Sequence, residues 1–289
     1  MLLVMHVLNP TLMVLIPLVL AAWVVRRWRL DWAVFGLGTV TFLVSQILHI
    51  PFNQFVLSPL IEQLGWLSAD GWPWVIVALM LGLSAGLFEE SARYLVLKRI
   101  SSRVQGWSEG VLYGLGHGGI EAIIIGGLGI YGLVQALALR GVPLEGVVPV
   151  EQLETARIQL EGYWGMVWYE PLWAVLERVS AIAFHSMAAL LVLMSIRQRR
   201  MIWLGGAILA HTLFNAVALV SVKALGVAAT ETILAAIGLG CLWVVYRLCP
   251  RWVVDPTDQI PPPEEGLSPQ PGPRVELLEA ERLDDSRFF

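Results

Sequence analysis

The sequence predicts an all-α fold: a polytopic membrane helical bundle with about seven transmembrane helices. Hydrophobic residues make up 57% of the 289 residues and charged residues only 15%, against roughly 45–50% and about 25% in ordinary soluble domains. Apolar segments long enough to cross a bilayer recur along the chain, separated by short polar joints. This composition excludes a soluble globular enzyme. The net charge of −4, with no basic stripe, argues against nucleic-acid binding.

Seven apolar segments have spanning length. The predicted spans are residues 4–25, 33–50, 73–97, 109–138, 172–195, 202–222 and 227–247. The first is a membrane helix rather than a cleavable signal peptide, because it lacks a basic segment before it and is followed by Arg26 and Arg27. Residues 51–72 are short of apolar length and contain two prolines, so they are predicted to form a loop with room for an interfacial helix.

Lys and Arg are distributed unevenly between the two sets of joints. Eleven lie on one set: Arg26, Arg27, Arg29, Lys98, Arg99, Arg103, Arg197, Arg199, Arg200, Arg247 and Arg251. The other set carries only Arg140, Arg157 and Lys223. Because cytoplasmic joints collect basic residues, the N-terminus is predicted outside and the C-terminus in the cytoplasm of a multi-pass cell-membrane protein. The acidic joint 139–171 is then external and too short to form a domain.

The end of the chain differs in composition from the rest. Residues 250–289 hold nine acidic and four basic residues and eight of the sixteen prolines. Such a segment cannot bury enough apolar surface to fold. The sequence therefore predicts a membrane-embedded domain at 1–249 and a disordered, acidic, Pro-rich cytoplasmic tail at 250–289.

Ionisable and polar residues lie deep inside four of the predicted spans. They are Glu89, Glu90 and Arg93; His117 and Glu121; Glu177, Arg178 and His185; and His211 with Asn215. A charge at the bilayer centre costs roughly 2.5–3.5 kcal/mol on insertion scales, which makes such residues functional candidates.

Their spacing predicts a single site. Counted from the basic joints, one carboxylate and three histidines lie about 12–18 Å from the cytoplasmic boundary, at ~1.5 Å per residue. Glu89 and Arg93, His117 and Glu121, and His211 and Asn215 are each four residues apart, so each pair shares a helix face. In lipid these faces must turn toward one another or toward water.

Small residues recur every fourth position on the span 109–138: Gly110, Gly114, Gly118, Ala122 and Gly126. This stripe predicts close contact with a neighbouring helix. His117 and Glu121 each precede a stripe member by one residue, so the same contact should turn them toward the interior.

A buried carboxylate, several histidines and an amide are suited to hydrolysis. Glu89 can act as a general base, and Arg93, one turn away, is predicted to hold and orient it. Glu121 is predicted to hydrogen-bond to His117. Alternatively, Glu89, His117, His185 and His211 can bind a divalent metal such as zinc that activates water. The sequence leaves both alternatives open and slightly favours metal-free chemistry. Glu177 and Arg178 are predicted to form a structural pair or a gate.

Three other intramembrane protease classes fit less well. An aspartyl protease needs aspartates in the membrane, but all six aspartates lie outside the predicted spans. A site-2-type zinc protease needs the motif H-E-x-x-H, which is absent. The third class is the serine, rhomboid-like protease. A G-x-S-x-G match places Ser84 in a Gly-rich helix but leaves Glu89, Glu90 and Arg93 unexplained.

Four short motifs resemble a known superfamily. They are Phe88-Glu89-Glu90-x-x-Arg93, Tyr113-x-x-x-His117, Phe184-His185 and His211-x-x-x-Asn215. They resemble the motifs of the type II CAAX prenyl protease superfamily, which includes PrsW-like proteases. Their order and helix placement are most similar to the YhfC-like family of intramembrane proteases. The resemblance covers roughly 75–220.

The resemblance implies a helical membrane core and a glutamate-activated water. Glu89 would be the base and Glu90 its companion carboxylate, with Arg93 orienting both. The remaining site residues would bind water, the substrate carbonyl or a metal: His117, His185, His211 and Asn215. CAAX proteases have one more residue between Glu and Arg and usually Phe at position 113, which argues against prenylated substrates here.

We therefore predict an intramembrane endopeptidase of the glutamate type that acts, among membrane lipids, on a peptide or membrane-protein substrate. A proton-coupled transporter or permease is the alternative, since buried Glu, His and Arg also form proton relays. No inverted repeat is found in support of it. An inactive membrane scaffold is the third alternative, and the intact motifs argue against it.

Overall fold

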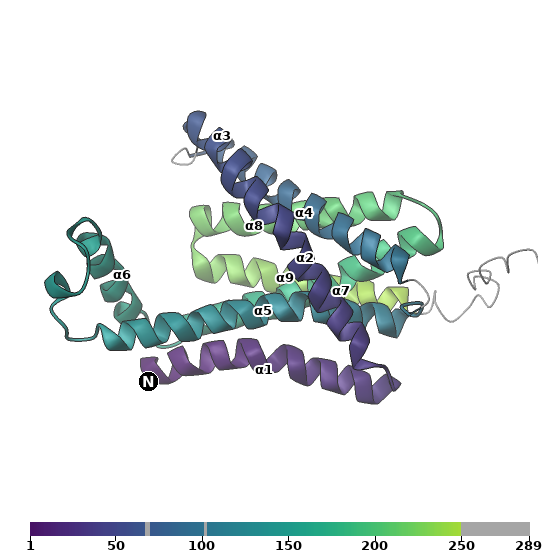
Figure 1. Cartoon of the computed structure of the whole chain (residues 1–289), viewed down its shortest axis with the longest axis horizontal. Coiled ribbons are helices and arrows are strands. Elements are labelled where there is room, and N and C mark those ends of the chain that lie inside the picture. Colours follow the sequence, from purple (N-terminus) through teal and green to yellow (C-terminus); the bar gives the residue numbers. More distant parts are fainter. Residues whose placement is uncertain (67–69, 101–102, 250–289) are drawn as a thin grey trace, which may run out of the picture. The chain divides into compact units, whose positions relative to one another are not determined.

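The computed structural model describes residues 1–66, 70–100 and 103–249, and the regular elements of this part of the chain are all helical. Seven helices are long and apolar enough to cross a membrane, as predicted. They begin and end as follows (Figure 1): α1 (Leu2–Trp28), α2 (Trp32–Phe52), α4 (Trp72–Arg99), α5 (Trp107–Ala138), α7 (Trp173–Arg197), α8 (Ile202–Leu225) and α9 (Val227–Leu248). The predicted tail, 250–289, lies outside the described residues.

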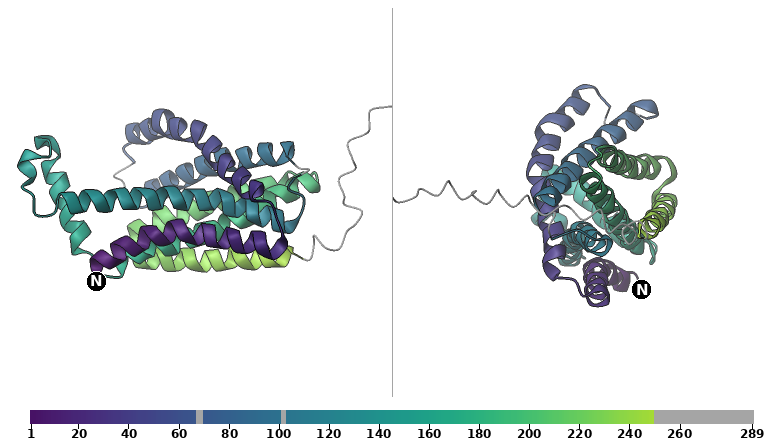
Figure 2. Two further views of the ribbon diagram at one scale, coloured as in Figure 1. Left: turned by 60° about the horizontal axis from the view of Figure 1, so that its bottom comes forward. Right: turned by 90° about the vertical axis from the view of Figure 1, so that its right-hand side faces the viewer.

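Helix α7 lies at the centre of the bundle and is the most buried of the seven. It packs against α5 on one side and α9 on the other, while α4 packs mainly against α8. Helix α5 also runs beside α1 and is crossed by α2 (Figure 2). The four helices that carry the predicted site, α4, α5, α7 and α8, are therefore neighbours.

Two close backbone approaches determine how the site helices meet. A Cβ atom added at Gly114 of α5 would lie 2.5 Å from Cα of Ser186 in α7. A Cβ atom added at Gly86 of α4 would lie 2.8 Å from the carbonyl oxygen of Ile208 in α8. No side chain fits at such distances, so glycine allows both contacts. Each contact is within one turn of a predicted site residue, which brings those side chains together.

The small-residue stripe of α5 is a packing surface, as predicted. Gly110, Gly114 and Gly118 face α7, and Gly126 faces α1 near Pro10.

The prediction of a loop at 51–72 was wrong for residues 51–63, which are helical. Helix α2 continues through a π-helical turn (Asn53–Leu57) into α3 (Ser58–Gln63). The Ser58 amide donates to the Asn53 carbonyl, five residues back, and this wider turn continues the helix beyond Pro51. Pro59 lies in the first turn of α3, where a missing N–H is tolerated. The second span is therefore extended to Trp32–Gln63.

The acidic joint 139–171 contains one exposed helix, α6 (Leu153–Gly165). It is attached to α1 because His6 Nε2 donates to the Tyr163 carbonyl oxygen at 3.2 Å, and the two rings stack 4.0 Å apart.

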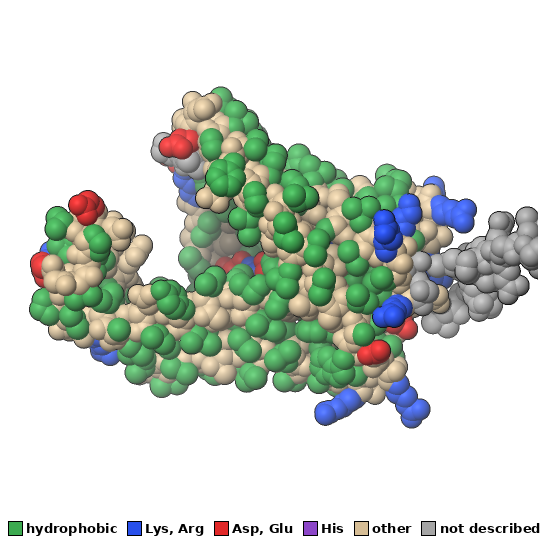
Figure 3. All heavy atoms as spheres, in the orientation of Figure 1, with side chains coloured by type: hydrophobic (Ala, Val, Ile, Leu, Met, Phe, Trp, Pro, Cys, Tyr) green, Lys and Arg blue, Asp and Glu red, His purple; other side chains and the backbone are tan. Residues whose placement is uncertain are grey.

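The two ends of the bundle differ in charge. The last turns of α1, α4, α7 and α9 all carry Lys or Arg. Figure 3 shows most of these basic side chains at one end, whereas Asp and Glu side chains are visible in the hollow between α3 and α5 toward the other end. This asymmetry is the one from which the orientation was predicted.

Candidate active site

Helix α4 places three charged side chains in the bundle interior. Glu90 and Arg93 have no exposed surface, and Glu89 is 6% exposed. The close approach of α8 at Gly86 brings His211 beside them, while α5 brings His117 and α7 brings His185. The predicted convergence of four helices is therefore confirmed by their contacts.

Glu90 is fully engaged by two donors. Its Oε2 accepts from Arg93 Nη1 at 2.5 Å, and its Oε1 lies 2.8 Å from His211 Nδ1. Because a carboxylate paired with a guanidinium only accepts, His211 carries a proton on Nδ1. The prediction that Arg93 holds Glu89 was wrong. Adjacent helical residues point about 100° apart, so one guanidinium does not reach both carboxylates.

Glu89 is where three other helices meet α4. Its Oε2 lies 3.1 Å from His117 Nε2 and 3.9 Å from His211 Nε2. Its Oε1 accepts a hydrogen bond from Gln46 Nε2 of α2 at 3.3 Å.

Sequence reasoning missed Gln46 and the polar chain behind it. Asn53 Nδ2 donates to His49 Nε2 at 3.0 Å, and His49 Nδ1 lies 3.2 Å from Gln46 Oε1. Ser84 Oγ donates to Asn53 Oδ1 at 2.6 Å. Every donor in this chain points along it toward Glu89. The sequence did contain a signal, because Gln46, His49 and Asn53 are spaced i, i+3 and i+7 and so share a helix face. The predicted span ended at residue 50, before Asn53, and the shared face was therefore not recognised.

His185 is held at both ring nitrogens. Arg93 Nη2 lies 3.1 Å from Nδ1, and Glu121 Oε2 lies 3.1 Å from Nε2. A guanidinium can only donate, so Nδ1 accepts and Nε2–H donates to Glu121. The prediction that Glu121 bonds to His117 was therefore wrong. The contact of α5 with α7 at Gly118 places the His185 ring beside Glu121 instead.

Glu121 also joins the site to a second ion pair. Its Oε1 accepts from Arg178 Nη1 at 2.8 Å, and Arg178 Nη2 donates to Glu177. Glu177 and Arg178 are thus a pair, as predicted. By contrast, no hydrogen bond of Asn215 is present among the described residues, although it is half-buried one turn after His211.

Comparison with known proteins identifies the family. The chain matches the YhfC intramembrane metalloprotease family over residues 12–237. The chain belongs to this family. It is also similar to "Uncharacterized membrane protein YhfC" of Bacillus subtilis (strain 168), with 33% identity over 237 residues, which cover 80% of this chain and 90% of the relative. No solved structure matches.

The YhfC description implies a metal, and the residues present fit one. Glu89, His117 and His185 are buried and offer ligand atoms within 4.8 Å of one another, the one such group of three among the described residues. Histidine nitrogen and carboxylate oxygen are a ligand set that zinc prefers, and three protein ligands leave a position for water. His117 Nδ1 is moreover buried without a hydrogen-bond partner. The family description thus favours the metal alternative over the metal-free one.

Proposed function

We propose that this YhfC family member hydrolyses peptide bonds of membrane-embedded substrates at the cluster centred on Glu89. The observation that carries the proposal is the buried convergence of Glu89, His117 and His185 from three helices. A buried charged cluster of this kind is costly in a membrane and gives little stability, which favours a catalytic role.

Glu89 and His211 together form a binding site for the attacking water. Glu89 Oε2 and His211 Nε2 lie 3.9 Å apart, and both are acceptors when His211 is neutral with its proton on Nδ1. A water about 2.8 Å from each atom donates one hydrogen to each and keeps its own lone pairs for attack. Glu89 then takes the proton as general base.

Glu90 and Arg93 act through His211. Glu90 accepts from His211 Nδ1 and so keeps the Nε2 lone pair facing Glu89, while Arg93 fixes Glu90. Asn215, whose amide has no partner among the described residues, is assigned the role of donor to the substrate carbonyl.

Glu89, His117 and His185 would hold a divalent metal such as zinc, which supplies a Lewis acid to polarise the scissile carbonyl and acidify water. His185 offers Nδ1 in place of its contact with Arg93, because Glu121 keeps Nε2 protonated. We further propose an external N-terminus and a cytoplasmic tail at 250–289, on the basis of the Lys and Arg distribution.

Cleavage of transmembrane peptides by the purified full chain tests this function. We expect Glu89→Gln and His211→Ala to lose about 10²–10⁴-fold in kcat, the typical contribution of general base catalysis. Glu151→Gln, which changes an exposed acid outside the spans, is the matched control and should cleave like wild type. Unchanged cleavage by Glu89→Gln would overturn the proposal, and proton flux without cleavage would favour the transporter.

Metal content is measured separately by mass spectrometry. We expect about one zinc-type ion per wild-type chain, and less in His117→Ala although it remains monodisperse. A chelator should remove metal and cleavage together, and zinc should restore both. Full cleavage by metal-free protein would contradict the metal role and leave Glu89 and His211 as the water-activating pair.

A further inference from the structure

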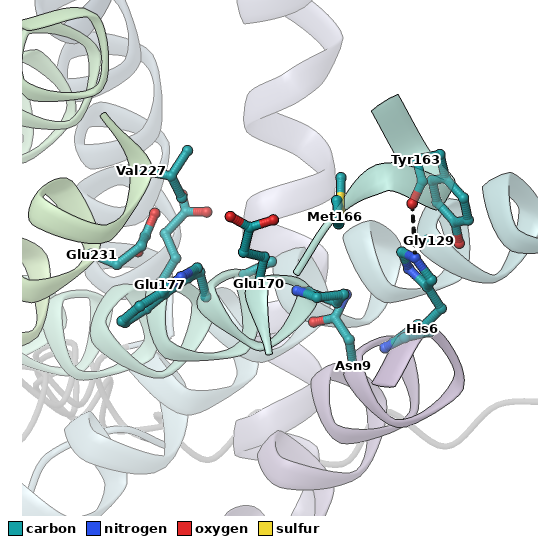
Figure 4. A pocket seen from close by; sticks show the side chains of 13 residues that line it. His6, Asn9, Gly129, Tyr163, Met166, Glu170, Glu177, Val227 and Glu231 are labelled. Carbon is teal, nitrogen blue, oxygen red and sulfur yellow. Dashed lines mark hydrogen bonds between the residues drawn. The ribbon is translucent and has the colours of Figure 1, made fainter. Parts of the chain in front are cut away.

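A second polar pocket lies at the end of the bundle that is poor in Lys and Arg. It has a volume of about 310 Å³, near the lower limit for small-ligand sites. Helix α1 contributes Asn9, α7 contributes Glu177 and α9 contributes Glu231, while Glu170 precedes α7. Figure 4 shows the carboxylates of Glu170, Glu177 and Glu231 beside one another, with Asn9 and His6 on the other side.

The unpaired atoms of this pocket are hydrogen-bond acceptors. Glu231 is only 7% exposed, and its Oε2 is buried without a partner. The Oδ1 atom of Asn9 is likewise buried and unpartnered. A buried acceptor without a donor is costly, so these two atoms need hydrogen bonds that the chain itself does not supply.

The charge of the pocket is also uncompensated. Arg178 is shared between Glu177 and Glu121, and Glu170 accepts only from the Val167 amide at 2.8 Å. No Lys or Arg is among the lining residues. Unpaired acceptors and excess negative charge together require a cationic donor.

The shape of the acidic group favours an organic cation over a metal ion. Among the described residues, the three carboxylates do not converge closely enough to form a metal-ligand group. The aromatic rings of Tyr163 and Trp173 also line the pocket and can interact with a cation through their faces. A phospholipid headgroup would bring a phosphate, for which the lining offers no Lys or Arg partner.

We propose that this pocket binds a primary ammonium group carried by a peptide, either a lysine side chain or a free N-terminus. The inference rests on the proposed function, because the peptide would be the protease substrate. Glu177 lines the pocket and is linked through Arg178 and Glu121 to His185 of the active site.

The spacing along α7 fixes where the ammonium lies on the substrate. His185 follows Glu177 by eight residues, about 12 Å of helix at ~1.5 Å per residue. Extended peptide covers that distance in about four residues at ~3.3 Å each. The substrate lysine or N-terminus should therefore lie about four residues from the cleaved bond.

The binding test is independent of proteolysis. Isothermal titration of the purified full chain uses n-butylammonium as the probe and 1-butanol as its uncharged analogue. We expect n-butylammonium to bind and butanol not to bind, with affinity reduced about tenfold or more in Glu231→Gln. Glu161→Gln, an exposed acid on α6 that does not line the pocket, should bind like wild type.

A second measurement distinguishes the source of the ammonium. A transmembrane peptide with lysine four residues from the cleaved bond is compared with its norleucine analogue. We expect norleucine to raise KM about tenfold in wild type with little change in kcat, and to have no such effect in Glu231→Gln.

Equal butylammonium binding by wild type and Glu231→Gln would overturn the proposed ammonium site. Tighter binding of phosphoethanolamine than of butylammonium would instead assign it to a lipid. If no peptide is cleaved but butylammonium binds as expected, the proposed function fails and the ammonium site stands.

Discussion

The two acidic regions of the membrane domain contrast in how their carboxylates are partnered. In the active site, Glu89 and Glu90 each receive hydrogen bonds at both oxygens from other side chains. In the pocket between α1, α7 and α9, Glu231 has nearly the same exposed fraction as Glu89, 7% against 6%, but leaves Oε2 unpaired. Burial alone therefore does not distinguish the two regions.

The difference teaches what each region requires. Carboxylates whose oxygens all accept hydrogen bonds are held in one arrangement, which suits a catalytic group that must be preorganised. A buried carboxylate without a donor is a cost in the free protein that a ligand can remove. The carboxylate oxygens of the active site are thus satisfied within the chain, whereas Glu231 Oε2 depends on a donor from outside it.

Replacing Glu90 by Gln should have the largest effect. The substitution leaves Arg93 buried without its ion partner, and breaking a buried pair costs about 3–5 kcal/mol. We expect the free energy of unfolding in mixed micelles to fall by that amount and cleavage to be lost. Glu154→Gln on the exposed helix α6 should stay within about 0.5 kcal/mol of wild type. Wild-type stability of Glu90→Gln would show that the network is not a structural unit.

The sequence predicted the helices of the fold more accurately than the connections between them. All seven spans occur, and six of them end within a few residues of their predicted ends, because long apolar segments in lipid have few alternatives to a helix. The segment 51–63 was predicted wrongly because Pro51 and Pro59 were interpreted as helix breakers. The π-helical turn that accommodates them depends on backbone hydrogen bonds that no local pattern reveals.

The site residues were predictable, but their partners were not. Rarity of charge in apolar helices was enough to select Glu89, Glu90, His117, His185 and His211. Pairing depends on helix rotation and approach, which are determined by contacts such as Gly118 against His185. For that reason Arg93 and Glu121 were each assigned the wrong partner.

Gln46 shows why an uncharged site residue is hard to predict from the sequence. An amide in an apolar segment carries no charge penalty, so it did not stand out. Only the packing of α2 against α4 shows that it reaches Glu89.

Substituting Gly114 by Ala should have an intermediate effect, because it separates helices without changing a charge. Its Cβ would lie 2.5 Å from the Ser186 backbone, so α5 and α7 must move apart. Overpacking of this kind costs about 1–3 kcal/mol, and the His117 and His185 rings, whose centroids are 4.7 Å apart, should separate. Unfolding and cleavage assays should show both losses. The matched control is Gly127→Ala on the same helix, where the new methyl group meets no atom within 4 Å. Equal behaviour of the two variants would mean that the close contact does not position the site.

The smallest change in the free energy of unfolding is expected for Glu231→Gln. The sign of that change tests most directly whether the two acidic regions differ. Replacing Glu231 by Gln removes a buried carboxyl group that forms no ion pair among the described residues and keeps the shape of the side chain, so the free energy of unfolding should rise by less than about 1 kcal/mol. The same change at Glu90 lowers it, because there the charge is paired. Without ligand, Glu231→Gln is expected to be more stable than wild type. Added n-butylammonium should make wild type the more stable of the two, because it binds the wild-type carboxylate and finds none in the variant. Destabilisation by Glu231→Gln without ligand would show that Glu231 already has a partner in the folded chain, and the two regions would then be alike.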